Sequence, residues 1–137
     1  MESTTSKNKI TYRSYIEEIF NQGKLELLDQ YVTDDYTLHD APPNIDSGKK
    51  AIEQVVSMFK GAFPDFKITL DHLVAEDAFV ASKATFEGTH SGNIFGLDAT
   101  GRRVKISSLT MVSFENGKIK ESWVRNDMES LKRQIEG

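Results

Sequence analysis

Two short segments contain the residues best suited to proton-transfer chemistry. The segment 86–92 carries His90, and the segment 117–127 holds the single tryptophan, Trp123, and ends with Asp127. An imidazole, a carboxylate and an apolar wall can move a proton to or from a substrate without a cofactor. Both segments have the pattern of neighbouring strands, so the sequence predicts that His90 and Asp127 belong to one site.

Asp127 is the first candidate for a general acid or base. Residues 119, 121, 123, 125 and 127 share one parity of a strand and would point to the same side. Burial beside the Trp123 indole would raise the pKa of the Asp127 carboxyl from about 3.9, because desolvation penalises the charged form. Two alternatives stay open: Asp127 caps the following helix, which its spacing favours, or it pairs with Arg125, which could instead bind Glu121.

The histidines offer further polar contacts. His90 lies between Gly88 and Gly92 and could donate a hydrogen bond to a carbonyl or shuttle a proton. A loop histidine bonded to the backbone is an equally good interpretation. His39 lies in a short strand and is predicted to line the same pocket, whereas His72 has the parity of core residues. No metal is expected, because no two histidines have ligand spacing.

Aromatic and apolar side chains are predicted to form the wall of a substrate pocket. The substrate-binding candidates beside His39 are Trp123, Phe59, Phe86 and Met111. Each is individually more typical of a core, yet pocket walls consist of such residues. Lys83, inside a strand of small residues, is either a solvated charge or half of a buried ion pair. The glycine spacing matches neither a phosphate loop nor a dinucleotide fingerprint, so no cofactor is predicted.

The first half of the chain has helical periodicity. Apolar residues recur at helical spacing over 12–20, and Gly23 stands where that helix would end. Ser47 is a candidate N-cap for a later helix, which Pro64 would stop. A short second helix is predicted over 25–31 and a brief strand over 36–40.

The second half alternates with the period of strands. Strands are predicted over 66–74, 78–89, 102–115 and 118–125, and Asn116-Gly117 is typical of a two-residue hairpin turn. A short helix over 127–135 ends the chain. Helices followed by antiparallel strands indicate an α+β domain. We expect a single domain over residues 8–136, with residues 1–7 disordered or frayed.

Composition excludes several classes of function. The 137 residues include 17 basic and 21 acidic side chains, a formal charge of -4 that argues against nucleic acid as a partner. The absence of cysteine excludes disulfides and thiolate chemistry. Without a signal peptide or a membrane-spanning run, the sequence predicts a cytoplasmic protein that does not bind membranes. Strand residues that are apolar on both faces predict a homodimer.

The chain resembles the SnoaL-like polyketide cyclases, or ester cyclases, of the nuclear-transport-factor-two-like superfamily. The resemblance covers about residues 12–135. Its motifs are carried by segments 21–25, 63–65, 88–92, 100–102 and 117–119, together with Tyr36, His39, Glu121, Trp123 and Asp127. The chain departs from the family pattern at Lys83, where many relatives carry arginine, and at Ala99, where proline is common; lysine cannot form the bidentate contacts of arginine.

The resemblance implies a cone-shaped α+β barrel, in which a curved antiparallel sheet wraps around the N-terminal helices and leaves a deep apolar pocket. It also implies ring closure by intramolecular aldol condensation without metal or coenzyme. Asp127 would be the general acid/base, and His90 would lie in the pocket.

From the residues and the resemblance together, the predicted function is that of a cofactor-independent cyclase or lyase. Its substrate would be a small hydrophobic, polyketide-like carbonyl compound bound in the cavity. The alternatives are an isomerase that moves a double bond, as ketosteroid isomerase does, and a protein that binds a small apolar ligand without catalysis.

Overall fold

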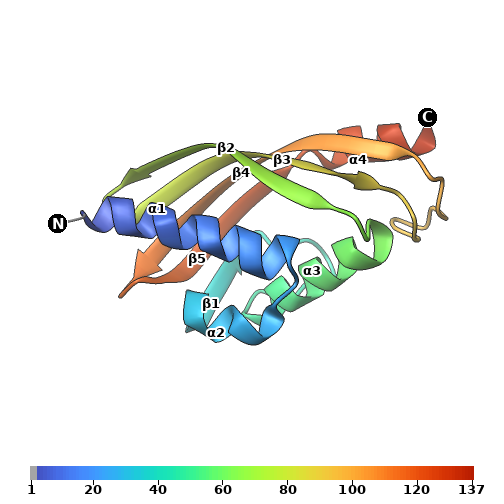
Figure 1. Cartoon of the computed structure of the whole chain (residues 1–137). Helices are drawn as coiled ribbons and strands as arrows, with labels where there is room; N and C mark the ends of the chain where they lie inside the picture. The colour runs from blue at the N-terminus through green and yellow to red at the C-terminus, as the bar shows by residue number, and fades with distance from the viewer. Residues whose placement is uncertain (1–2) are drawn as a thin grey trace.

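The computed structural model describes residues 3–137 and consists of helices packed on one mixed sheet (Figure 1). The α+β class predicted from the sequence is confirmed. A π-helical segment, Ile16–Asn21, continues the first α-helix, and a 3₁₀ turn, Leu25–Leu27, precedes the second. The helices are α1 (Thr4–Tyr15), α2 (Leu28–Tyr31), α3 (Lys50–Ala62) and α4 (Met128–Glu136). The strands are β1 (Val32–His39), β2 (Lys67–Glu76), β3 (Phe79–Thr89), β4 (Arg103–Glu115) and β5 (Lys118–Asn126).

The five strands form one sheet in the order β1-β5-β4-β3-β2. The strands β2 to β5 follow one another as antiparallel neighbours, as predicted. The expectation of a wholly antiparallel sheet is wrong at one edge, because β1 runs parallel to β5. The chain leaves β1, passes through α3 and enters the sheet again at the opposite edge, so no tight hairpin constrains the direction of β1.

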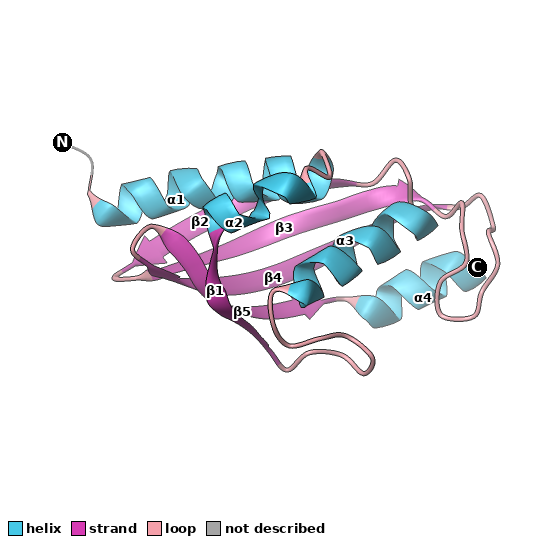
Figure 2. Ribbon diagram, turned by 90° about the horizontal axis from the view of Figure 1, so that it is seen from below, coloured by secondary structure: helices cyan, strands magenta, loops and turns pink. Residues whose placement is uncertain are grey.

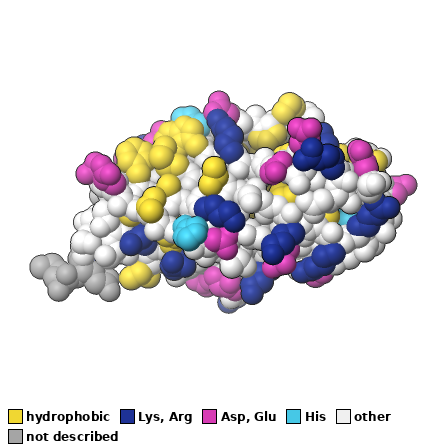
Figure 3. Space-filling view, turned by 90° about the horizontal axis from the view of Figure 1, so that it is seen from above, with side chains coloured by type: hydrophobic (Ala, Val, Ile, Leu, Met, Phe, Trp, Pro, Cys, Tyr) yellow, Lys and Arg dark blue, Asp and Glu magenta, His cyan; other side chains and the backbone are white. Residues whose placement is uncertain are grey.

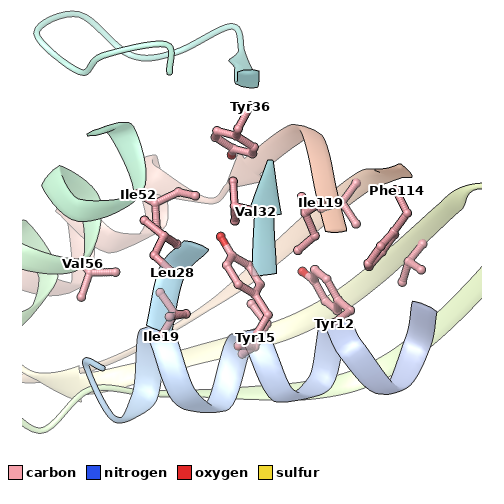
Figure 4. Packing of buried hydrophobic residues seen from close by; sticks show 13 residues of the cluster. Tyr12, Tyr15, Ile19, Leu28, Val32, Tyr36, Ile52, Val56, Phe114 and Ile119 are labelled. Carbon is pink, nitrogen blue, oxygen red and sulfur yellow. The ribbon is translucent and has the colours of Figure 1, made fainter. Parts of the chain in front are cut away.

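The N-terminal helices and α3 cover one face of the sheet (Figure 2). Tyr12, Tyr15 and Ile19 project from this side into a core that includes Val32 and Ile119 (Figure 4). A second buried cluster lies beyond it and includes Phe59, Phe63, Phe66, Phe86 and Leu131. The helical layer therefore packs on the inner face of the sheet. Hydrophobic side chains also gather on the opposite, outer face (Figure 3), to which the strand register assigns the exposed Val74 and Leu109.

Turn chemistry explains where several elements begin and end. Gly23 has a φ of 69° after the first helix, and Asn116 and Gly117 have φ values of 50° and 81° in the β4–β5 hairpin, as their residue types predicted. The predicted Ser47 cap is wrong, since α3 begins at Lys50 without a side-chain cap. Asp46 organises this turn instead and accepts a hydrogen bond from the Gly48 amide.

The N-terminal segment differs from the prediction of a frayed end over residues 1–7. Helix α1 begins at Thr4, and the Ser3 side chain caps it by accepting a hydrogen bond from the Ser6 amide. Residues 4–7 therefore belong to the helix, while the part of the prediction that concerns residues 1–2 lies outside the described residues. No helix within residues 3–137 is long and apolar enough to cross a membrane.

Candidate functional site

A cavity of about 770 Å³ lies between the inner face of the sheet and the helices. Because side chains alternate along a strand, every second residue of β3, β4 and β5 faces it. Its wall is mainly apolar, with hydroxyl groups at intervals. The strands β3, β4 and β5 contribute Ser82, Ala84, Phe86, Ile106, Ser108, Thr110, Val112, Ser122, Val124 and Asn126; α3 contributes Ala51, Ile52, Val55, Met58 and Phe59.

Buried tyrosines place hydroxyl groups against this wall. The Tyr12 and Ser82 hydroxyl oxygens lie 3.1 Å apart in a buried hydrogen bond. Burial raises the pKa of Tyr36 to about 12, outweighing the opposing effect of its hydrogen bond to Ser122. Burial likewise raises the pKa of Tyr12 and of Tyr15. These hydroxyls stay protonated at neutral pH and can donate hydrogen bonds inside an apolar space.

Two of the predicted substrate-binding aromatics lie in the cavity wall. Phe59 and Phe86 come from α3 and β3, and their ring centroids lie 4.8 Å apart. Phe86 also stacks on Phe66, with a centroid distance of 5.3 Å. This aromatic group joins the helix to the sheet and gives the cavity a rigid end wall.

The structure does not bring Trp123 and Met111 to the cavity; the predicted pocket contacts of these two residues are wrong. Both side chains have the parity of the outer face of the sheet. Trp123 lies under the ring of His39 at a centroid distance of 4.7 Å and an interplanar angle of 11°. His39 forms part of the cavity rim at the end of β1, while its ring stacks on the indole outside.

The carboxylates of Glu121 and Asp40, near this rim, each bind neighbouring side chains. Glu121 Oε1 lies 3.0 Å from His39 Nε2, and Glu121 Oε2 accepts a hydrogen bond of 2.7 Å from the Ser113 hydroxyl. The Ser113 bond and then the His39 contact lower the pKa of Glu121. Arg125 pairs with Asp40 at 2.8 Å, so it takes neither of the partners, Asp127 and Glu121, that the sequence suggested.

Asp127 lies at the rim rather than inside the cavity. Its carboxylate is exposed, and Oδ1 accepts a hydrogen bond of 3.1 Å from the Ser130 amide as the N-cap of α4. Asp127 therefore acts as a helix cap, one of the alternatives left open by the sequence, and the predicted burial of its carboxyl against Trp123 is wrong. Its chain neighbours Asn126 and Met128 both line the cavity, which keeps Asp127 next to the opening.

His90 is fully buried and lies outside the cavity wall. Its Nδ1 lies 3.0 Å from the Thr100 hydroxyl, and the ring packs 5.7 Å from Phe63. Nε2 has no hydrogen-bond partner within the described residues. These contacts fasten the loop between β3 and β4 to the domain, so the geometry matches the structural interpretation of His90 rather than contact with a substrate in the cavity.

Sequence reasoning missed much of the wall, namely Tyr36, Ser108, Thr110 and Val124. Strand parity could have identified these residues. Because Trp123 was predicted to point inward, its strand neighbours Ser122 and Val124 were placed on the wrong face. Lys83 is also an outer-face residue, and its ammonium group pairs with Asp71 at 2.8 Å. Within residues 3–137, no three histidine, aspartate or glutamate side chains form a group that could hold a metal ion.

Comparison with known proteins identifies the family to which this chain belongs. The sequence pattern of the SnoaL-like polyketide cyclases matches residues 10–135. The chain belongs to the SnoaL-like polyketide cyclase family. The resemblance inferred from the sequence is thereby confirmed.

Individual relatives agree with this assignment. The chain is 27% identical over 120 residues to nogalonic acid methyl ester cyclase of Streptomyces nogalater. The aligned region covers 85% of this chain and 88% of that protein. The structure of IdmH, described as a putative polyketide cyclase from Streptomyces antibioticus, superposes with a TM-score of 0.83 at 28% identity, covering 95% of this chain and 99% of that one. TsrD from Streptomyces laurentii has the same fold, with a TM-score of 0.86 at 24% identity and coverage of 98% of each chain.

Proposed function

We propose that this protein is a cofactor-independent cyclase that closes a ring in a small hydrophobic, polyketide-like carbonyl compound. The observation that carries the proposal is the apolar cavity of about 770 Å³ with hydroxyl groups in its wall. A volume of this size accommodates a molecule of several fused rings. Family membership and the cyclase relatives support the same reaction class.

The cavity suits an intramolecular aldol reaction. A base removes a C–H proton next to one carbonyl group, and the resulting enolate carbon attacks a second carbonyl carbon of the same molecule. One C–C bond forms, the π bond of the attacked carbonyl breaks and its electron pair moves to the oxygen, and the resulting alkoxide takes up a proton. Holding both ends of a folded substrate against a rigid wall accounts for much of the acceleration, because the reaction becomes a positioned, unimolecular step.

The tyrosine and serine hydroxyls of the wall would act on the carbonyl oxygens. Tyr12 and Ser82 form a hydroxyl pair in the cavity, and Tyr36 and Ser122 also line it. A hydroxyl group that turns from its partner toward a substrate carbonyl would stabilise the charge of the enolate or the alkoxide. In an apolar enclosure such a bond is worth more than in water.

We assign the proton transfer to Asp127. Three features support the assignment: the resemblance to cyclases with an aspartate at this position, the location between Asn126 and Met128 at the cavity rim, and the use of only Oδ1 in the helix cap. The second carboxylate oxygen is therefore available to a substrate whose reacting carbon reaches the rim. A substrate covering the rim would also remove water from the carboxylate and strengthen it as a base.

The test is turnover of nogalonic acid methyl ester, the compound named for a relative, by the wild type and by Asp127→Asn. Asparagine caps a helix as well as aspartate does, so the variant should fold normally. We expect cyclisation, seen as a product of unchanged mass and new retention time, to fall about 100-fold or more in the variant. Equal rates in both proteins would refute the assignment of Asp127.

The same experiment separates the alternatives. A product that differs only in the position of a double bond would identify an isomerase. Tight binding of the compound, with no conversion by the wild type, would identify a protein that only binds ligands. Asp127→Ala is the control for the helix cap, since it removes both the base and the cap and should lower the free energy of unfolding by about 1 kcal/mol.

We further propose that the outer face of the sheet joins two copies of the chain. Its exposed hydrophobic side chains are Val74, Phe79, Leu109 and Met111 (Figure 3). Two ion pairs of this face lie within the chain, Lys83 with Asp71 and His39 with Glu121. These pairs lie beside the apolar group and reduce the charge that two facing copies would have to desolvate, which favours a second copy as the partner.

Sedimentation equilibrium tests this dimer. The wild type should sediment at twice the chain mass, and Leu109→Glu should sediment as a monomer because it introduces an unpaired charge at the centre of the apolar group. The control Lys132→Glu, on α4, should leave the mass unchanged. A monomeric wild type at all concentrations would refute the dimer and leave the cavity proposal intact.

A further inference from the structure

The loop between β3 and β4 is fixed at its base. The His90 amide donates to the Arg102 carbonyl, and the Gly101 amide donates to the His90 carbonyl, each at 2.9 Å. The Gly92 amide bonds to the Ala62 carbonyl of α3 at 3.1 Å. A Cβ atom at Gly92 would come within 2.1 Å of the Gly61 carbonyl oxygen, so only glycine permits this approach. The base of the loop is therefore pressed firmly onto α3.

The tip of this loop is a two-residue turn with an unusual residue in it. Ile94 and Leu97 exchange both backbone hydrogen bonds, at 3.1 and 2.9 Å, around Phe95 and Gly96. Phe95 has a φ of 56° and Gly96 a φ of 74°. Both positions of such a turn favour asparagine, aspartate or glycine. A bulky side chain at positive φ is uncommon and strained.

The same chain contains the ordinary version of this turn. The β4–β5 hairpin uses Asn116 and Gly117 at φ values of 50° and 81°. That hairpin lies away from the cavity, whereas Phe95 is part of the cavity lining. The two turns thus have similar positive φ values at both central residues. They differ in that Phe95 lines the cavity, whereas Asn116 does not.

Burial does not account for Phe95. Its neighbour Ile94 is buried and anchors the turn, but Phe95 remains 42% exposed at the cavity mouth. The Lys132 ammonium lies 5.1 Å from the centre of the Phe95 ring and also lines the cavity. An aromatic ring held in a strained turn, half in solvent and beside an apolar space, can gain its missing contacts from a bound molecule.

We propose that Phe95 is a ligand-contacting residue that determines specificity. Its ring closes one side of the cavity mouth and stacks on a flat, conjugated ligand. Aromatic stacking favours planar rings over branched aliphatic chains of equal size. The proposal rests on the proposed function, since it takes the cavity as the substrate site, and it assigns to Phe95 the selection of planar over branched ligands there.

The probe for the test is Nile red, a flat, uncharged and conjugated carbonyl compound whose fluorescence rises in apolar surroundings. Phe95→Asn converts the turn to the sequence found at residues 116–117. We expect its melting temperature to rise, because the strain at positive φ is relieved, while its affinity for Nile red falls at least five-fold. Phe95→Tyr keeps the ring and should retain wild-type affinity.

Asn116→Phe is the matched control, since it introduces the same strain into the distant hairpin. Its melting temperature should fall, with Nile red affinity unchanged. Unchanged affinity in Phe95→Asn would overturn the proposal, and so would a fall in its melting temperature, which would show that the ring serves the fold.

Ser108→Trp separates failure of this inference from failure of the cavity site. The indole would fill part of the cavity from β4, so Nile red binding should be lost. If Ser108→Trp abolishes binding and Phe95→Asn does not change it, only the role of Phe95 is refuted. If Ser108→Trp leaves binding unchanged, the probe does not occupy the cavity and the substrate site itself is refuted.

Discussion

The inner and outer faces of the sheet are built from the same strands but suit different kinds of contact. Toward the helices, β3 to β5 present Phe86, Val112 and Val124 around a cavity, with hydroxyl groups bonded to one another. On the opposite face, Leu109 is 59% exposed and charged residues pair across neighbouring strands. Alternation by one residue therefore separates a surface for a small apolar molecule from a surface suited to another copy of the chain.

The comparison also shows how the two faces hold their polar groups. On the inner face the tyrosines are buried and stay neutral, and burial raises their pKa values. On the outer face Glu121 and Asp71 are ionised and bonded to partners, which lowers their pKa values. The inner face should thus lose stability in alkali, and the outer face should lose it in acid.

The largest difference should appear when side chains of the two faces are truncated. Phe86→Ala removes a ring that packs on Phe59, Phe63 and Phe66, and it should lower the free energy of unfolding by about 3–5 kcal/mol. Leu109→Ala on the outer face should change it by less than about 0.5 kcal/mol in the monomer. Urea unfolding at low protein concentration measures both. Similar losses would mean that the two faces are not distinct.

The second-largest effect should be a loss of folding stability at alkaline pH, which arises from the inner face. Tyr36 has its pKa raised to about 12 in the folded state, against 10.0 for an exposed tyrosine. Its contribution is therefore complete below pH 10 and is lost as the pH rises toward 12, at roughly 1.4 kcal/mol per pH unit. Tyr36→Phe should flatten this decline in urea unfolding curves. An unchanged slope would show that Tyr36 ionises as readily in the folded protein as in the unfolded one.

Acid should weaken the outer face by a smaller amount. The folded-state pKa of Glu121 is lowered from 4.5, so its stabilising effect is present above that value and is lost as the pH falls below it. Because the side chain is partly exposed, solvent screening keeps the effect below about 1 kcal/mol. Glu121→Gln should reduce the loss of stability between neutral and acidic pH, and Glu136→Gln is the matched control. Equal acid profiles for wild type and Glu121→Gln would contradict the role of this pair.

The sequence predicted most of the fold because its signals are local. Alternating apolar residues identified the four consecutive strands, Asn116-Gly117 identified the last turn between them, and Gly23 identified the end of the first helix. The parallel pairing of β1 with β5 could not be predicted in the same way. It depends on where the chain returns after α3, which is a matter of tertiary packing rather than of local pattern.

The candidate site was less predictable, because strand parity gives two faces without saying which one is inside. Trp123 and Met111 are large and apolar, and their size suggested the cavity, yet they lie on the outer face. Phe59 and Phe86 were assigned to the wall, where they lie. The sequence leaves open whether Arg125 pairs with Asp127 or with Glu121; in the structure Asp40, which follows β1, binds it at 2.8 Å instead.

The most direct test of the account is a crystal structure of the Asp127→Asn variant with nogalonic acid methyl ester. The account predicts the ligand between the β3–β5 inner face and α3, in contact with Phe86 and with the Phe95 ring, and with its reacting carbons near residue 127. A ligand bound on the outer face, or a cavity that stays without ligand at saturating concentration, would contradict it.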